Sequence, residues 1–256
     1  MDFYIASLSD IGIKRKENQD AVFAASYCNG RENAAFAVLC DGMGGLSHGA
    51  MASASVVHAF TRWAEEQLPV MDYAAVTEEQ LCAVWTELVR NENDTLRAFG
   101  KNNGCSAGST LVVALLTERR YYIMNVGDSR AYFVTSNIRQ ITEDHTVIAE
   151  EVRKGNLSEE QAEQAPIKNI LTRCIGVYPQ VQPDFFFGKI EPKTICLLCS
   201  DGFRHLISKA EMRDAFLLQK ELDSTDLGER VKYLVELNKS RGETDNISAV
   251  AINVKS

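Results

Sequence analysis

The sequence lacks a long uncharged apolar run, and its first residues lack a basic segment followed by an apolar core. A membrane-spanning helix needs about 20 consecutive apolar residues, and no run approaches that length. A secretory leader needs the missing basic and apolar segments. We therefore expect a soluble, cytoplasmic protein with no membrane partner.

Basic residues are too few to balance the acidic ones. Lysine and arginine total 27 against 35 aspartates and glutamates, a formal net charge of −8, which argues against a nucleic-acid partner. Internal repeats, low-complexity segments and proline- or serine-rich linkers are also absent. Because 45% of the 256 residues are hydrophobic, the chain can bury a sizeable core. We expect residues 1–256 to form a single, monomeric domain.

The seven cysteines are odd in number, and most lie inside apolar runs, where a free thiol behaves as a small hydrophobe. Cys196 and Cys199 have the spacing of a zinc knuckle, but no second Cys/His pair accompanies them. On a predicted strand, residues three apart point to opposite faces. We expect both to be buried free thiols.

Hydrophobic periodicity predicts an α+β protein. Strands are predicted over residues 1–9, 20–27, 36–40, 110–116, 121–126, 131–134, 185–190, 194–199 and 247–254, those between 110 and 134 as an antiparallel meander. Helices are predicted over 47–68, from Thr77 onward, 209–219 and 227–238, with capping boxes at Thr77–Gln80, Ser158–Gln161, Ser208–Glu211 and Asp226–Glu229. The helices come in two separate pairs, which indicates antiparallel sheet between helical layers.

Acidic residues recur at the ends of predicted strands, each beside a glycine or an asparagine. They are Asp41, Asp128, Asp201 and Asp245. Any one of them alone is typical of a turn or helix cap, but carboxylates gathered at one edge repel each other unless cations compensate. Ligation by oxygen alone suits magnesium or manganese. Two such ions sharing a carboxylate can activate a bridging water and stabilise charge on a phosphoryl group.

A series of short motifs extends along the chain. They are Ser9-Asp10-Ile11-Gly12 with Arg15, Asn18 and Asp20; Asp41-Gly42-Met43-Gly44-Gly45; Gly108-Ser109-Thr110; Asn125-Val126-Gly127-Asp128-Ser129-Arg130; Asp144-His145-Thr146; Leu171-Thr172-Arg173; Ser200-Asp201-Gly202; and Thr244-Asp245-Asn246. Their order resembles that of a known family, the metal-dependent serine/threonine protein phosphatases (PPM, type 2C), in its compact bacterial form. The resemblance covers essentially the whole chain.

The resemblance implies a four-layer α-β-β-α sandwich of two antiparallel sheets, with two Mn²⁺ or Mg²⁺ ions at one end. By position, Asp41 would bridge both ions, and the carbonyl of Gly42 would bind one of them. Asp201 and Asp245 would bind the other ion. Asp128 and Asp201 match the acids that hold a third, weaker metal in bacterial relatives.

Further positions match residues around the metals. Arg15 matches the arginine that grips the substrate phosphate, although without the family it reads as a surface arginine in a basic loop. Asn18, Gln19, Asp20 and Asn246 are expected beside the ligands, where Asn18 and Asp20 would order metal-bound waters or the Arg15 loop.

The sequence departs from the family at two positions. Met43 stands where animal relatives carry the histidine proposed as general acid, so the leaving group must take its proton from water or another group. Gln19 replaces a common glutamate, and the neutral amide weakens the local negative field. We expect packing or turn roles for Thr110, Arg130 and His145. Residues 146–170 match the variable flap beside the active site.

The expected activity is metal-dependent hydrolysis of phosphoserine and phosphothreonine in proteins, including targets of a bacterial serine/threonine kinase. A cysteine phosphatase is disfavoured because Cys199 to Arg204 is one residue short of the usual loop. A nucleotide-binding loop is disfavoured because residues 42–45 have no following Gly-Lys-Ser/Thr. A regulatory pseudophosphatase that only binds partners is the remaining alternative, against which the retained acids and Arg15 argue.

Overall fold

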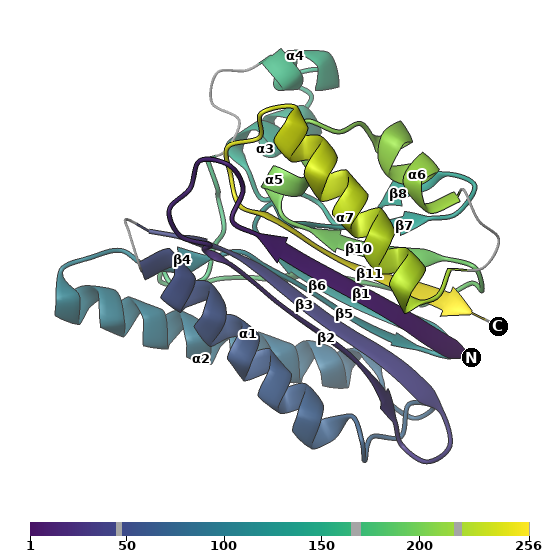
Figure 1. The fold of residues 1–256 in the computed structure, drawn as a ribbon. Helices are drawn as coiled ribbons and strands as arrows, with labels where there is room; N and C mark the ends of the chain where they lie inside the picture. Colours follow the sequence, from purple (N-terminus) through teal and green to yellow (C-terminus); the bar gives the residue numbers. More distant parts are fainter. Residues whose placement is uncertain (45–47, 165–169, 218–221, 256) are drawn as a thin grey trace.

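The computed structural model describes residues 1–44, 48–164, 170–217 and 222–255. Two antiparallel sheets stack face to face, and helices cover both outer faces (Figure 1). The first sheet has the order β1 (Asp2–Asp10), β11 (Ile247–Lys255), β10 (Ile195–Cys199), β7 (Arg130–Val134), β8 (Ile138–Gln140). The second has the order β2 (Asp20–Cys28), β3 (Asn33–Met43), β5 (Leu111–Thr117), β6 (Arg120–Val126), β9 (Asp184–Lys189), with β4 (Gly108–Ser109) paired to β3.

The helices form the outer layers. They are α1 (His48–Gln67), α2 (Glu78–Asn103), α3 (Val147–Arg153), α4 (Glu159–Gln164), α5 (Asp201–Arg204), α6 (Lys209–Leu217) and α7 (Ser224–Ser240). Figure 1 shows α1 and α2 on the second sheet and α7 on the first. Among the described residues, no helix is both long and apolar enough to cross a membrane.

Strand β3 shows how the sequence builds these layers. Phe36 and Val38 point into the core shared with α1 and α2, whereas Ala37 and Leu39 point into the core between the sheets. All are fully buried, because alternate side chains of a central strand face opposite layers. A third core lies between the first sheet and helices α5 to α7. The α-β-β-α sandwich is confirmed.

The two strand cysteines follow the same rule. Cys196 lies in the core between the sheets, and Cys199 lies in the core beneath α5 to α7. Both are fully buried free thiols. The prediction that they point to opposite faces of the strand is confirmed.

The predicted meander is wrong at its third strand. β5 pairs with β6, but β6 then pairs with β9, and β7 lies in the other sheet between β10 and β8. Residues 127–129 therefore carry the chain from one sheet to the other. A short polar connection has the same local pattern whether it turns within a sheet or crosses between sheets.

Most helix starts agree with their capping signals. Thr77 and Gln80 form both bonds of a capping box at α2. For α7 the predicted start is three residues late, because Asp223 is the cap and Asp226 is the third residue of its box. Two acids three positions apart offered two possible caps. The boxes at Ser158–Gln161 and Ser208–Glu211 are also present.

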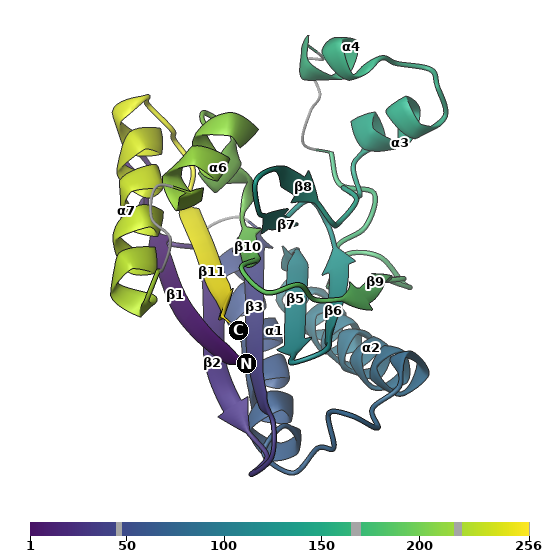
Figure 2. The ribbon, with the colours of Figure 1, turned by 90° about the vertical axis from the view of Figure 1, so that its right-hand side faces the viewer.

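The described part of the flap (residues 146–170) contains two short helices, of which the Ser158–Gln161 capping box predicts only the second. Thr146 caps α3, its hydroxyl accepting the N–H of Ala149, and α4 follows. Both stand away from the stacked sheets (Figure 2). The predicted helix residue at 47, the end of the helix predicted over 209–219, and part of the flap lie outside the described residues.

Candidate active site

Asp41 lies near the end of β3, and the sheet register places Asp20 opposite it on β2. Thr110 fixes the backbone of Asp41, since its N–H donates to the Asp41 carbonyl and its hydroxyl accepts the Asp41 N–H, both at 2.9 Å. Burial, together with the charges of Asp201 and Asp245, raises the pKa of Asp20 to about 7. Burial, and then Asp20, raise the pKa of Asp41 well above its usual range.

Gly42 follows Asp41 at a point where the backbone has no room for a side chain. A Cβ atom there would lie 2.1 Å from the Gly49 carbonyl oxygen and 2.6 Å from the Gln19 carbonyl oxygen. The Gly42 N–H donates to that Gln19 oxygen over 3.0 Å. The start of α1 therefore packs directly on the turn that carries Asp41.

Asp201 and Asp245 come from two segments that touch each other. A Cβ atom on Gly202 would lie 2.1 Å from the Asn246 carbonyl oxygen and 3.2 Å from Asp245 Cβ. Asp201 begins α5 directly after β10, and Asp245 precedes β11, which pairs with β10. These adjacent strands bring the two carboxylates, 44 positions apart in the numbering, to one end of the sheet.

Asn246 ties the N-terminal loop to this end of the sheet. Its Oδ1 accepts the Gln19 N–H over 2.9 Å, and its Nδ2 donates to the carbonyls of Ile11 and Glu17. In the same loop, Asn18 Nδ2 donates to Ser9 Oγ over 2.7 Å. Asn18, Gln19 and Asn246 thus order the loop that carries Arg15.

Arg15 points at the acidic cluster. Its Nη2 donates to Asp245 Oδ2 over 2.7 Å, and this bond raises the pKa of the guanidinium, with Asp41 and Asp201 adding to the effect. The side chain is 51% exposed. A guanidinium that faces acids on one side and solvent on the other can also receive an anion.

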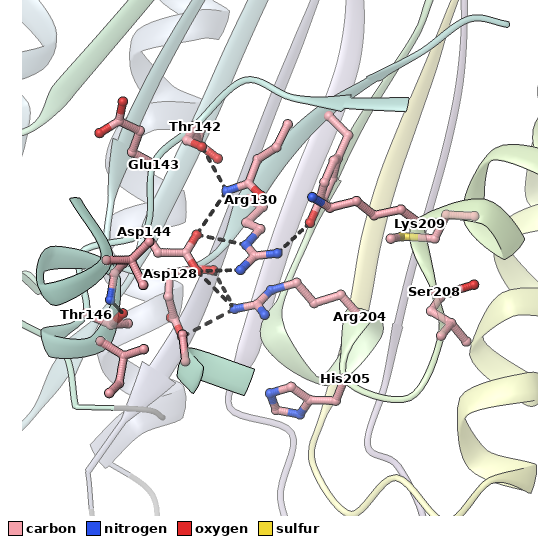
Figure 3. Close-up of a pocket in the computed structure, with 18 of the residues that line it drawn as sticks. Asp128, Arg130, Thr142, Glu143, Asp144, Thr146, Arg204, His205, Ser208 and Lys209 are labelled. Carbon is pink, nitrogen blue, oxygen red and sulfur yellow. Dashed lines mark hydrogen bonds and ion pairs between the residues drawn. The ribbon is translucent and has the colours of Figure 1, made fainter. Parts of the chain in front are cut away.

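Asp128 lies in the connection between the two sheets. Gly127 precedes it with a φ of +104°, a backbone conformation that residues with a side chain rarely adopt. Burial, and then the charge of Asp201, raise the pKa of Asp128 to about 6 against the opposing charge of Arg204. Arg204 Nη2 donates to the Asp128 carbonyl over 3.1 Å and lies 3.7 Å from Asp144 Oδ2, as Figure 3 shows.

His145 holds that connection from behind. Its ring is fully buried, Nδ1 accepts the Gly127 N–H over 3.1 Å, and Nε2 lies 2.9 Å from Asp184 Oδ2. Burial lowers the pKa of His145, and the Asp184 hydrogen bond offsets part of that effect. These contacts describe a neutral ring that donates from Nε2. The Asp144-His145-Thr146 motif draws attention to His145, but no local pattern in the sequence identifies Asp184 as its partner.

The carboxylate oxygens of this site are the kind of ligand that hard divalent cations prefer. Asp20 Oδ2 and Asp201 Oδ1 are buried and have no hydrogen-bond partner among the described residues. Unpaired buried carboxylate oxygens are costly, and a cation removes that cost. In the part of the chain that the structure describes, no group of three or more acidic, histidine or cysteine side chains is close enough together to hold a metal ion. Arg15 occupies one oxygen of Asp245 instead.

A cavity of about 1200 Å³ opens beside Asp128 (Figure 3). One wall is the flap helix α3, with Ile148 and Val152, and the opposite wall runs from Arg204 through α6. Arg130 also lines the cavity and forms two hydrogen bonds with Asp144. The cavity therefore presents both apolar and charged side chains next to the acidic cluster.

Comparison with known proteins gives a consistent result. The family model described as protein phosphatase 2C matches residues 13–222. A serine/threonine phosphatase Stp of Listeria welshimeri serovar 6b is 31% identical over 250 residues, 95% of this chain and 93% of that protein.

Solved structures agree. The serine/threonine phosphatase of S. agalactiae superposes with a TM-score of 0.85 at 27% identity, covering 99% of this chain and 100% of that chain. The catalytic domain of the serine/threonine phosphatase PstP, solved in complex with two manganese ions, superposes with a TM-score of 0.80 at 26% identity, covering 99% of each. With the fold and the acidic strand ends already in place, these matches show that the chain belongs to the protein phosphatase 2C family.

Proposed function

We propose that this protein hydrolyses phosphoserine and phosphothreonine in proteins, using two Mn²⁺ or Mg²⁺ ions. The observation that carries the proposal is the cluster of acids around Asp41, whose pKa is raised by burial and by Asp20, Asp201, Asp128 and Asp245. Such a cluster needs either protonation or compensating positive charge, and metal cations supply that charge. The relative solved with two manganese ions supports the same cofactor here.

Each acid has a specific role in this proposal. The Asp41 carboxylate would hold both ions, the Gly42 carbonyl one of them, and Asp201 and Asp245 the other. Asp128, with Asp201, would hold a third, weaker ion. When bound, the ions supply activation of a bridging water and neutralisation of phosphoryl charge.

Arg15 would bind and orient the phosphate. Its planar fork of N–H donors matches two phosphate oxygens, and its half-exposed side chain can turn from Asp245 toward solvent. Asp245 would then lose its guanidinium partner, and a metal ion would supply the positive charge in its place. Arg15 would thus exchange one anionic partner for another.

The cavity beside Asp128 would receive the peptide chain that carries the phosphate. It lies between the flap and α6, and it has both apolar side chains and hydrogen-bonding groups. The substrates in this proposal are phosphoproteins, including those made by a bacterial serine/threonine kinase. The protein would act in the cytoplasm as a single-domain monomer.

The test is release of phosphate from p-nitrophenyl phosphate and from a phosphothreonine peptide. We expect activity with Mn²⁺ and none with EDTA, restored by excess Mn²⁺. A protein that binds phosphopeptides but releases no phosphate with either metal would instead be a regulatory pseudophosphatase.

A further inference from the structure

His205 lies between two acids at the candidate site. Its Nε2 is 3.4 Å from Asp201 Oδ2, and its Nδ1 is 3.3 Å from Glu243 Oε2. His205 follows α5 directly and is four residues after Asp201, the spacing at which side chains of one helical turn meet. Neither His205 nor Glu243 belongs to the motifs through which the chain resembles its family.

Glu243 supports the neighbouring turn. Its side chain is only 6% exposed, and its Oε1 accepts the N–H groups of Thr244 over 2.7 Å and of Asp245 over 2.9 Å. Its own N–H donates to the carbonyl of Asn238 near the end of α7. One oxygen of Glu243 therefore fixes the backbone at Asp245, while the other faces His205.

The contacts form a continuous connection from Asp201 through His205 and Glu243 to Asp245. His205 contacts Oδ2 of Asp201, whereas Oδ1 of the same carboxylate is buried without a hydrogen-bond partner among the described residues. The ring thus lies against one oxygen of the carboxylate and leaves Oδ1 for a cation. Residues that orient metal ligands in this way commonly change metal affinity by roughly 10- to 100-fold when replaced.

We propose that His205 and Glu243 are positioning residues that hold Asp201 and Asp245 at a fixed separation and thereby strengthen Mn²⁺ binding. The inference rests on the proposed function, in which both acids bind the same ion. It adds that two residues outside the family motifs set the affinity of the site.

Isothermal titration of the full chain with Mn²⁺ tests this proposal, together with thermal unfolding in EDTA. We expect His205→Gln and Glu243→Gln each to weaken Mn²⁺ binding about tenfold. Glutamine at 243 keeps an oxygen for the two N–H groups, so its unfolding temperature in EDTA should stay close to that of the wild type. The double variant should lose little more than either single variant, because both break one connection. His58→Gln, on the exposed side of α1, is the matched control and should bind Mn²⁺ normally.

The outcomes separate the two proposals. If the wild-type chain binds no Mn²⁺, the proposed function fails. Suppose that the wild type binds Mn²⁺ and Asp201→Asn weakens binding, but His205→Gln and Glu243→Gln bind Mn²⁺ as tightly as His58→Gln does. The metal site then stands, and the positioning role of His205 and Glu243 is refuted. Losses that add in the double variant would also refute it, since they would show two independent effects.

Discussion

The Arg15 guanidinium donates to Asp245 Oδ2 over 2.7 Å, although the two residues are 230 positions apart. The residue proposed to grip the phosphate is therefore paired with one proposed to hold a metal ion. Because charge-assisted bonds of this kind are short and strong, Arg15 and a cation compete for the same carboxylate.

The first prediction concerns this pair. Arg15→Ala should raise KM for a phosphothreonine peptide roughly 10- to 100-fold, since a hydrogen bond to a charged group contributes about 1.5–3 kcal/mol. Steady-state kinetics at saturating Mn²⁺ measures the change. Arg15→Lys keeps the charge without the fork and should recover only part of the loss. Arg31→Ala, an exposed turn residue, is the control. An unchanged KM would exclude the clamp.

Asp41→Asn should abolish turnover without unfolding the protein. The variant replaces a carboxyl group whose charged form is disfavoured, since burial and neighbouring acids raise the pKa of Asp41. In EDTA its unfolding temperature should therefore equal or exceed that of the wild type, while Mn²⁺ should stabilise it less. Calorimetry with and without Mn²⁺ measures both effects. Full activity in the variant would contradict the ligand role of Asp41.

Gly42→Ala should destabilise the protein and disturb the site. The added Cβ would lie 2.1 Å from the Gly49 carbonyl oxygen, so α1 or the Asp41 turn must move, at a cost of about 1–3 kcal/mol. Gly228→Ala in α7 is the matched control, because nothing lies within 4 Å of its Cβ. That change should stabilise the helix by roughly 0.5–1 kcal/mol. Urea unfolding measures the free energy of unfolding of both variants. An equal change in the two would refute the close approach of the backbone at Gly42.

His145 should make stability depend on pH. Burial lowers its pKa from the ordinary value of 6.5, so the folded protein resists protonation that the unfolded chain accepts. This contribution is fully present above pH 6.5 and is lost as pH falls below that value toward the folded-state pKa. His145→Gln should reduce the stability at pH 7.5 but flatten the decline between pH 7 and 5. Parallel curves for variant and wild type would show that the ring is not buried neutral.

Local patterns in the sequence predicted much of the architecture. The continuous apolar run in β3 predicted a buried strand, and the Thr77–Gln80 box predicted the start of α2. The start of α7 was predicted three residues late, because Asp223 and Asp226 both fit the role of a cap. The path of β7 was also wrong, since pairing with β10 depends on a strand more than 60 positions away in the numbering.

The position of the acids at strand ends follows from the residues alone, because apolar runs and turn residues are local properties. The groups that meet these acids depend on the packing of the whole fold. The Arg15–Asp245 pair, the His145–Asp184 contact and the His205–Glu243 contact each join segments from different elements. Side-chain partners of this kind are set by how the sheets and helices pack, and residue spacing along the chain does not encode them.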